Sequence, residues 1–124
     1  MIDTHNISVV VSYFNEEESI IDTLNLLRMQ TLMPAEVHLI NSGSTDNTFS
    51  IINSWLAKHK IDNYYNVDAG TLVPSSSINA GIELSKSDWI ALIDCGLLFP
   101  HNWLELQLNT AVSNNADVVI GFVV

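Results

Sequence analysis

Three apolar segments of this sequence each end in polar side chains that are able to bind ligands. ISVVVSYF (7–14) is followed by Asn15 and Glu16, EVHLI (36–40) by Asn41 and Ser42, and WIALI (89–93) by Asp94. A carboxylate in such a place can bind a divalent cation through its oxygens, and it can equally cap the turn that follows it. Asp94 therefore has three interpretations: a metal ligand, a cap, or the remnant of a site that has lost its partner residue.

The other reactive residue types have ordinary structural explanations. Cys95 has no sequence neighbour that would lower the pKa of its thiol, which indicates a small packed residue rather than a nucleophile. Ser44 and Asp46 are typical helix caps, and Glu16–Glu18 match the positive end of a helix. The histidines lack metal-ligand spacing, and the tryptophans fall in periodic segments typical of a core: His5, His38, His59, His101, Trp55, Trp89 and Trp103.

Composition restricts the class of ligand and partner. The 124 residues suit one domain, and a hydrophobic content of 48% is enough for a real core. Acidic residues outnumber basic ones 14 to 4, for a formal net charge of −10. This charge argues against nucleic acid and an anionic membrane surface as partners, because both require clustered Lys and Arg. An anionic ligand would need positive potential from helix N-termini or from a bound cation.

The sequence predicts a cytoplasmic protein, or a cytoplasmic piece of a larger one. Cys95 is the only cysteine, so no intramolecular disulfide can form and a reducing compartment is the simpler interpretation. No apolar run approaches the roughly 20 residues of a membrane span. The polar start MIDTHN carries no basic residue of a signal peptide.

Apolar periodicity predicts alternating strands and helices. Strands are expected at 7–14, 36–41, 64–68, 89–94 and 117–124. Helices are expected over the stripe of Ile20, Leu24 and Leu27 and at 48–56, 78–86 and 102–114, with 69–77 as a loop. This alternation is typical of βαβ units, so we expect an α/β fold, a parallel-sheet αβα sandwich, in a single domain over residues 1–124. Because the last strand ends the chain, either that strand is central or the domain is truncated at its C-terminal side.

The ends of three predicted strands are expected to converge. In doubly wound sheets, ligands bind outside the carboxyl ends of the strands, at the point where the strand order reverses. If the first strand is central, the second lies on one side of it and the 89–94 strand on the other. Asn15–Glu16, Asn41–Ser42 and Asp94 then face one crevice, which favours a binding site there.

Three motifs resemble those of family 2 glycosyltransferases of the GT-A fold. ISVVVSYFNEEESIIDTLNLLRMQT (7–31) resembles the family's opening strand and its Pro-Thr-Tyr-Asn-Glu motif. VHLINSGSTDNT (37–48) resembles its second strand and Asp-rich turn, and NAGIELSKSDWIALIDCGLLFPHNWLE (79–105) resembles the stretch that holds its Asp-X-Asp metal motif. The matches lie in order over almost the whole chain. The resemblance implies a Rossmann-like GT-A nucleotide-binding half-domain.

The resemblance also implies a function and a set of ligands. It implies the nucleotide-sugar-binding part of an enzyme that transfers a sugar from a nucleotide-diphosphate donor to an unknown acceptor. The residues implied to bind the nucleotide sugar are Phe14, Asn15, Glu16, Asn41, Ser42 and Asp94. Among these, Phe14 and Glu16 would lie against the nucleoside and Asn41 would face the base. Asp94 would bind a divalent cation, Mg²⁺ or Mn²⁺, which neutralises charge on the diphosphate leaving group.

Several positions depart from the family pattern. The paired acids of the second turn are Asn41 and Ser42, the second metal-motif acid is Gly96, and a frequent basic residue before the NAG stretch is Ile78. The later region with the acceptor-activating carboxylate has no counterpart, so the 124 residues alone are not expected to catalyse transfer. We therefore expect cation binding to depend on bound nucleotide.

The departures leave a second hypothesis open: a non-catalytic GT-A-like module for binding or assembly, with homo-oligomer formation also open. Two other classes fit less well. A signalling receiver, with Asp68 as its phosphorylated residue, would require a later lysine, and none lies beyond Lys86. A P-loop nucleotidase would require a GxxxxGK loop, and the sequence has none.

Overall fold

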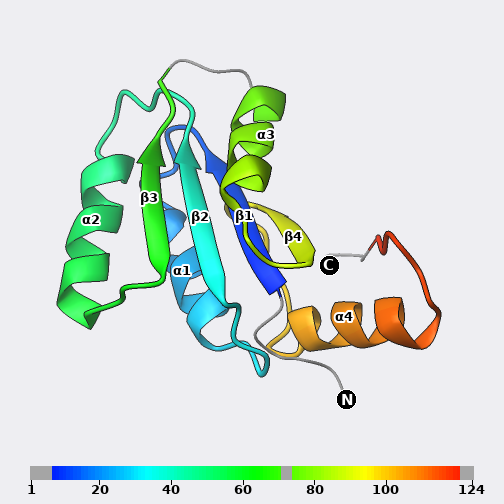
Figure 1. Ribbon diagram of the computed structural model, residues 1–124. Helices are drawn as coiled ribbons and strands as arrows, with labels where there is room; N and C mark the ends of the chain where they lie inside the picture. Colours follow the sequence, from blue (N-terminus) through cyan, green and yellow to red (C-terminus); the bar gives the residue numbers. More distant parts are fainter. Residues whose placement is uncertain (1–6, 71–73, 121–124) are drawn as a thin grey trace.

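The computed structural model describes residues 7–70 and 74–120 and contains a sheet of four parallel strands in the order β3-β2-β1-β4 (Figure 1). The strands are β1 (Ile7–Tyr13), β2 (Glu36–Asn41), β3 (Tyr64–Asp68) and β4 (Trp89–Asp94). The helices are α1 (Ile20–Arg28), α2 (Thr48–His59), α3 (Pro74–Leu84) and α4 (Trp103–Ser113). The alternating order and the parallel pairings confirm the predicted α/β fold. No helix among the described residues is both long and apolar enough to cross a membrane.

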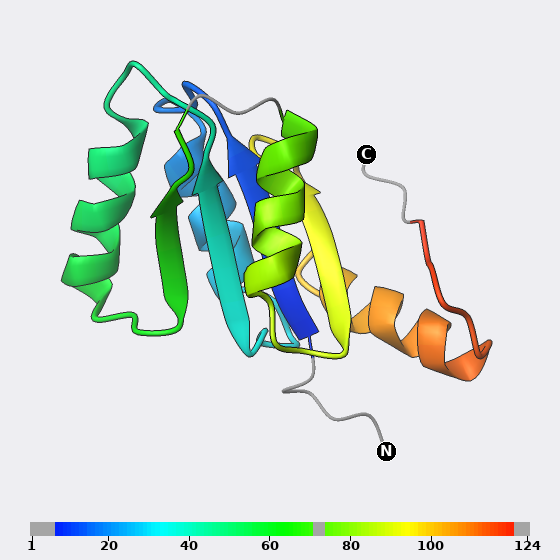
Figure 2. The same cartoon turned by 45° about the horizontal axis from the view of Figure 1, so that its top comes forward.

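The two faces of the sheet are covered by different helices. Figures 1 and 2 show α1 behind the sheet and α3 in front of it. Val9 and Val11 of β1 belong to the same core cluster as Leu24 of α1. On the other face α3 approaches very closely, because a Cβ on Gly81 would lie 2.4 Å from Val10 Cγ1. Coverage on both faces explains why β1 reads as a continuous apolar run rather than an alternating one.

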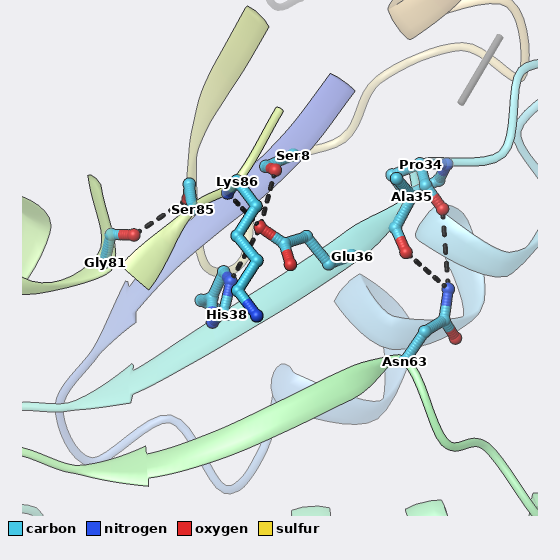
Figure 3. A network of polar contacts seen from close by, with 9 residues as sticks. All are labelled: Ser8, Pro34, Ala35, Glu36, His38, Asn63, Gly81, Ser85 and Lys86. Carbon is cyan, nitrogen blue, oxygen red and sulfur yellow. Dashed lines mark hydrogen bonds and ion pairs between the residues drawn. The ribbon is translucent and has the colours of Figure 1, made fainter. Parts of the chain in front are cut away.

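A polar network fixes the amino-terminal ends of β1 and β2. Glu36 Oε1 accepts hydrogen bonds from Ser8 Oγ (2.8 Å) and from the Lys86 backbone N–H (2.6 Å), and His38 Nε2 lies 3.1 Å from it (Figure 3). Desolvation acts to raise the pKa of Glu36, but these donors outweigh it, and the pKa lies below its ordinary value. The network ties both strands to the turn before β4, at the edge opposite the strand tips.

Two boundaries differ from the sequence prediction. Helix α3 begins at Pro74, inside the expected loop 69–77, because proline suits the first turn of a helix, where its missing N–H is not needed. The strand predicted at 117–124 is wrong for residues 117–120, where no strand forms. Val118 and Ile120 are 77% and 86% exposed there, so β-branched residues alone did not produce a strand without a paired neighbour. Residues 121–124 of that prediction lie outside the described residues.

Candidate functional site

The carboxyl ends of the four parallel strands meet at one edge of the sheet. Tyr13 pairs with Asn41, Asn41 pairs with Asp68, and Ser12 pairs with Asp94. Strand β1 lies between β2 and β4, so the strand order reverses at β1 as the sequence predicted. Polar residues from β2, β3 and β4 therefore lie along one edge.

Asn15 joins the tip of β1 to the turn that follows β2. Its backbone has a φ of 51°, a left-handed conformation that asparagine tolerates better than most residues. Its Oδ1 accepts hydrogen bonds from the backbone N–H groups of Thr45 (2.8 Å) and Asp46 (3.3 Å). Its own backbone N–H donates to Ser44 Oγ at 3.0 Å. Asn15 thus organises two loops that are 30 residues apart in the sequence.

The next residues extend this connection into two helices. The Glu16 backbone N–H donates to Thr48 Oγ1 (2.9 Å), and the Glu16 carboxylate accepts from Ser19 Oγ (2.6 Å) before α1. Asp46 Oδ1 accepts from the hydroxyl and backbone N–H of Thr48 at the start of α2, although the N-cap of this helix is Asn47, which makes no side-chain cap hydrogen bond. Desolvation acts to raise the pKa of Asp46, but the Thr48 donors hold it below its ordinary value. Phe14, at the end of β1, remains 52% exposed.

Asn41 and Ser42 are both buried, and their polar atoms have protein partners. Asn41 Oδ1 accepts from the Ser44 backbone N–H (2.9 Å), while Asn41 Nδ2 donates to Asp68 Oδ1 (3.4 Å). Ser42 Oγ lies 2.6 Å from Ser77 Oγ, within hydrogen-bond distance. These two side chains therefore support the crevice more than they project into it.

Asp94 is exposed at the tip of β4. Among the described residues, no side chain is seen to donate a hydrogen bond to its carboxylate. It borders a cavity of about 160 Å³ between β1, β4 and α3. The cavity is lined by Val10, Ser12, Ile78, Leu92, Ile93, Asp94, Leu97, Phe99 and Trp103. Asp94 is thus the acidic side chain most open to a ligand on this side of β1.

The residues that follow Asp94 fold back onto α1. Gly96 has a φ of 88°, and its N–H donates to Thr23 Oγ1 at 3.0 Å. A Cβ on Gly96 would lie 3.9 Å from Glu16 Oε2. Cys95 Sγ lies 3.6 Å from Thr23 Oγ1, and partial burial raises the pKa of this thiol. The raised pKa agrees with a packed cysteine rather than a nucleophile.

Sequence reasoning missed one residue of this edge. Asp68 ends β3 beside Asn41, yet the sequence patterns point to it only as the phosphorylated residue of a signalling receiver. The sequence does carry a signal for Asp68, because this residue also directly follows a strand-forming run, YYNV. Within the described residues, no group of three or more His, Cys, Asp or Glu side chains is arranged to hold a metal ion. A single carboxylate leaves most of the coordination shell of a hard cation to other oxygens.

The chain is similar in sequence to known proteins. A family model described as glycosyl transferase family 2 matches residues 8–124. The chain belongs to glycosyl transferase family 2. Similar proteins include an uncharacterized glycosyltransferase of Rickettsia bellii, 33% identical over 88% of this chain and 15% of that protein. Glycosyltransferase GlyG of Streptococcus pneumoniae is 27% identical over 93% of this chain and 38% of that protein. The family 2 chain thus spans less than half the length of these relatives.

Solved structures share the fold of this family 2 domain. S. aureus TarS 1–349 in complex with UDP superposes with a TM-score of 0.76 at 21% identity, over 89% of this chain and 33% of that one. Mannosyltransferase PcManGT from Pyrobaculum calidifontis, in complex with GDP-Man and Mn²⁺, superposes with a TM-score of 0.76 at 23% identity, over 94% of this chain and 34% of that one. These neighbours are GT-A glycosyltransferases, which confirms the fold that the motifs implied.

Proposed function

We propose that this chain is the nucleotide-sugar-binding portion of a glycosyltransferase that transfers a sugar from a nucleotide-diphosphate donor to an acceptor. The observation that carries the proposal is the position of Asp94, exposed at the tip of β4 on the same edge as Asn41. One side of β1 then suits a nucleoside and the other suits a diphosphate. The complexes of TarS with UDP and of PcManGT with GDP-Man and Mn²⁺ support this use of the fold.

The side chains of the site would have different roles in binding the donor. Phe14 and Asp94, both exposed, would contact the donor directly. Asn15, Asn41 and Ser42 would position the turn that shapes the nucleoside side, because their polar atoms already bind other residues of the turn or sheet. The Glu16 carboxylate, held by Ser19, would form the wall between the two sides.

Asp94 would hold a divalent cation, Mg²⁺ or Mn²⁺, and such a cation neutralises charge on a diphosphate leaving group. The chain itself brings only 4 Lys and Arg residues against 14 acids, so it repels an anionic donor unless charge is compensated locally. Because position 96 is glycine, phosphate oxygens and water would complete the coordination shell. Binding of cation and nucleotide is therefore expected to be mutually dependent.

Calorimetry on the full-length protein tests the proposal. UDP and GDP are titrated with and without Mn²⁺ or Mg²⁺, and separate titrations use each metal alone. We expect one nucleotide to bind, more tightly with metal, and the metal alone to bind weakly. If neither nucleotide nor its sugar conjugates bind under any condition, the proposal fails. Tight Mn²⁺ binding without nucleotide would contradict the proposed dependence.

A second candidate function is a non-catalytic binding or assembly module. It is favoured by the absence of acids at Asn41, Ser42 and Gly96, where the family pattern has them. Sugar transfer by the full-length protein decides between the two candidates. Transfer that is lost in Asp94→Ala would rule out the module, whereas nucleotide binding without transfer to any acceptor tested would favour it.

A further inference from the structure

The few basic side chains of this acidic chain are unevenly distributed. The sequence has 4 Lys and Arg residues, and three of them lie at the ends of two helices. Arg28 is in the last turn of α1, Lys58 is in the last turn of α2, and Lys60 is the C-cap of α2. Arg28 and Lys60, together with His59, line a cavity of about 260 Å³. Half of the Lys and Arg residues therefore line one cavity in a chain whose net charge is −10.

This cavity lies at the end of the sheet opposite the strand tips. It forms where α1 and α2 end and β3 begins, at the lower end of β3 in Figure 1. Asn63 fixes one wall, because its Nδ2 donates to the Ala35 carbonyl at 3.2 Å (Figure 3). The five residues of β3 separate the cavity from the strand tips by about 13 Å. It is therefore distinct from the crevice that Asp94 borders.

Tyr64 adds an unpaired hydroxyl to the wall of the cavity. The residue lines the cavity and is only 5% exposed, and its hydroxyl has no hydrogen-bond partner in the described part of the chain. The Trp55 ring packs between two of the lining rings, with centroids 6.3 Å from Tyr64 and 4.8 Å from His59. Burial raises the pKa of Tyr64 to about 12, although Arg28 opposes the rise, so the hydroxyl keeps its proton at neutral pH. A buried donor without an acceptor is costly, and a bound ligand would satisfy it.

Compensation of helix dipoles explains only part of this arrangement. Basic side chains in the last turn stabilise the negative end of a helix dipole, and Lys58 can do so without lining the cavity. That role requires neither a cavity nor a buried hydroxyl. Although the exposed Asp62 also lines the cavity, neither Arg28 nor Lys60 forms an ion pair with another residue that the structure describes. Both cations can therefore pair with an anionic ligand.

We propose that this cavity binds a phosphate group, either inorganic phosphate or the phosphate monoester of a small molecule. The Arg28 guanidinium and the Lys60 ammonium would neutralise the phosphate, and the Tyr64 hydroxyl would donate to one of its oxygens. Because that hydroxyl is covered, the long, exposed Arg28 side chain would turn onto the phosphate and uncover it as binding occurs. A phosphate carries nearly two negative charges, so it matches two cations better than a carboxylate does. This inference goes beyond the proposed function and does not depend on it.

Calorimetry on the full-length protein, with a metal chelator and at constant ionic strength, tests this proposal. Inorganic phosphate and glucose 6-phosphate are titrated separately, which distinguishes the two sources of the group, and glucose is the probe without phosphate. We expect saturable binding of at least one phosphate compound and none of glucose. Lys60→Gln should weaken that binding about tenfold, whereas Lys58→Gln, which removes the same charge outside the cavity, should change it less than about twofold.

Tyr64→Phe separates ligand binding from a structural role of the hydroxyl. The variant keeps the ring that packs on Trp55, and phosphate binding should weaken about tenfold. Its stability in phosphate-free buffer should be unchanged or higher, because an unpaired buried polar group is removed. A structural hydroxyl would instead show lower stability with phosphate affinity intact.

Three outcomes would overturn the proposal. They are the absence of saturable binding of either phosphate compound to the wild type, equal weakening in Lys60→Gln and Lys58→Gln, and unchanged phosphate affinity in Tyr64→Phe. Equal weakening would mean that phosphate is attracted only to the general positive charge at the end of α2. Tyr64→Phe should bind UDP or GDP with Mn²⁺ as the wild type does, so failure here would leave the proposed function standing.

Discussion

The two sides of the crevice are built in different ways. The β1–β2 tip, residues 14–16 and 41–48, is joined by hydrogen bonds between loops about 30 residues apart. The β4 tip, residues 94–96, carries an exposed carboxylate, and the structure shows no donor to it among the described residues. The β1–β2 tip is therefore organised before any ligand binds, whereas the β4 tip presents the single exposed carboxylate of Asp94.

This difference suggests how binding energy is used at each side. A preorganised turn has already lost its conformational freedom in folding, so binding a nucleoside there would cost little further conformational entropy of the turn. An isolated carboxylate holds a hard cation weakly, and it gains strength only when a diphosphate supplies further oxygens. Mutations of the β1–β2 tip should then act through stability, and mutation of Asp94 itself through metal-dependent binding.

The largest expected effect is at Asn15. Asn15→Ala removes the one oxygen that accepts hydrogen bonds from two backbone N–H groups, and it places at a φ of 51° a residue that tolerates this conformation less well than asparagine. We expect the free energy of unfolding to fall by about 3 kcal/mol, from roughly 1 kcal/mol of backbone strain and about 1 kcal/mol for each hydrogen bond. Urea denaturation followed by circular dichroism measures this change.

Asn15→Gly is the matched control, because glycine adopts this conformation without strain but also lacks the acceptor. It should lose about 2 kcal/mol, which is less than alanine loses. Losses below about 1 kcal/mol in both variants would show that the connection between the loops adds little to stability.

Gly96 at the β4 tip should give the next largest effect. Gly96→Ala places a side chain at a φ of 88° and should cost about 1–2 kcal/mol. Gly96→Asp should cost at least as much, because its Cβ would lie 3.9 Å from Glu16 Oε2 and the two carboxylates repel. It should not create a metal site that works without nucleotide. Denaturation and Mn²⁺ titration of both variants check this, and tight ligand-free Mn²⁺ binding by Gly96→Asp would refute it.

The fold was predictable from local patterns, because each element carries its own periodicity. The run Val9–Val11 required cover on both faces and so placed β1 inside the sheet. The partners of Asn41 were not predictable, since they depend on how the turn brings the Ser44 N–H onto its amide oxygen. The strand prediction for residues 117–120 was wrong for a related reason. A strand needs a paired neighbour, and composition does not reveal whether one is present.

Asp94→Asn should change binding and leave stability alone. Its side chain is exposed, so the free energy of unfolding should stay within about 0.5 kcal/mol of wild type. The enhancement of nucleotide binding by Mn²⁺ should fall about tenfold, equivalent to about 1.4 kcal/mol. Calorimetry with and without Mn²⁺ measures this ratio, and Asp62→Asn is the control that should retain it. A large loss of stability in Asp94→Asn would mean that the carboxylate has a structural role instead.

The smallest expected effect is a pH dependence at the β1–β2 tip. The Thr48 donors hold the pKa of Asp46 below its ordinary value in the folded state, despite desolvation, so the unfolded chain takes up the proton first. The stabilisation is therefore present above the ordinary aspartate pKa and is lost as pH falls through the folded value. Asp46→Asn and Thr48→Val should both flatten this part of the stability profile, whereas Thr48→Ser, which keeps the hydroxyl, should not. Unfolding measured between neutral and acidic pH tests the prediction. If neither Asp46→Asn nor Thr48→Val changes the slope, then the order of this tip comes from Asn15 rather than from the charge of Asp46.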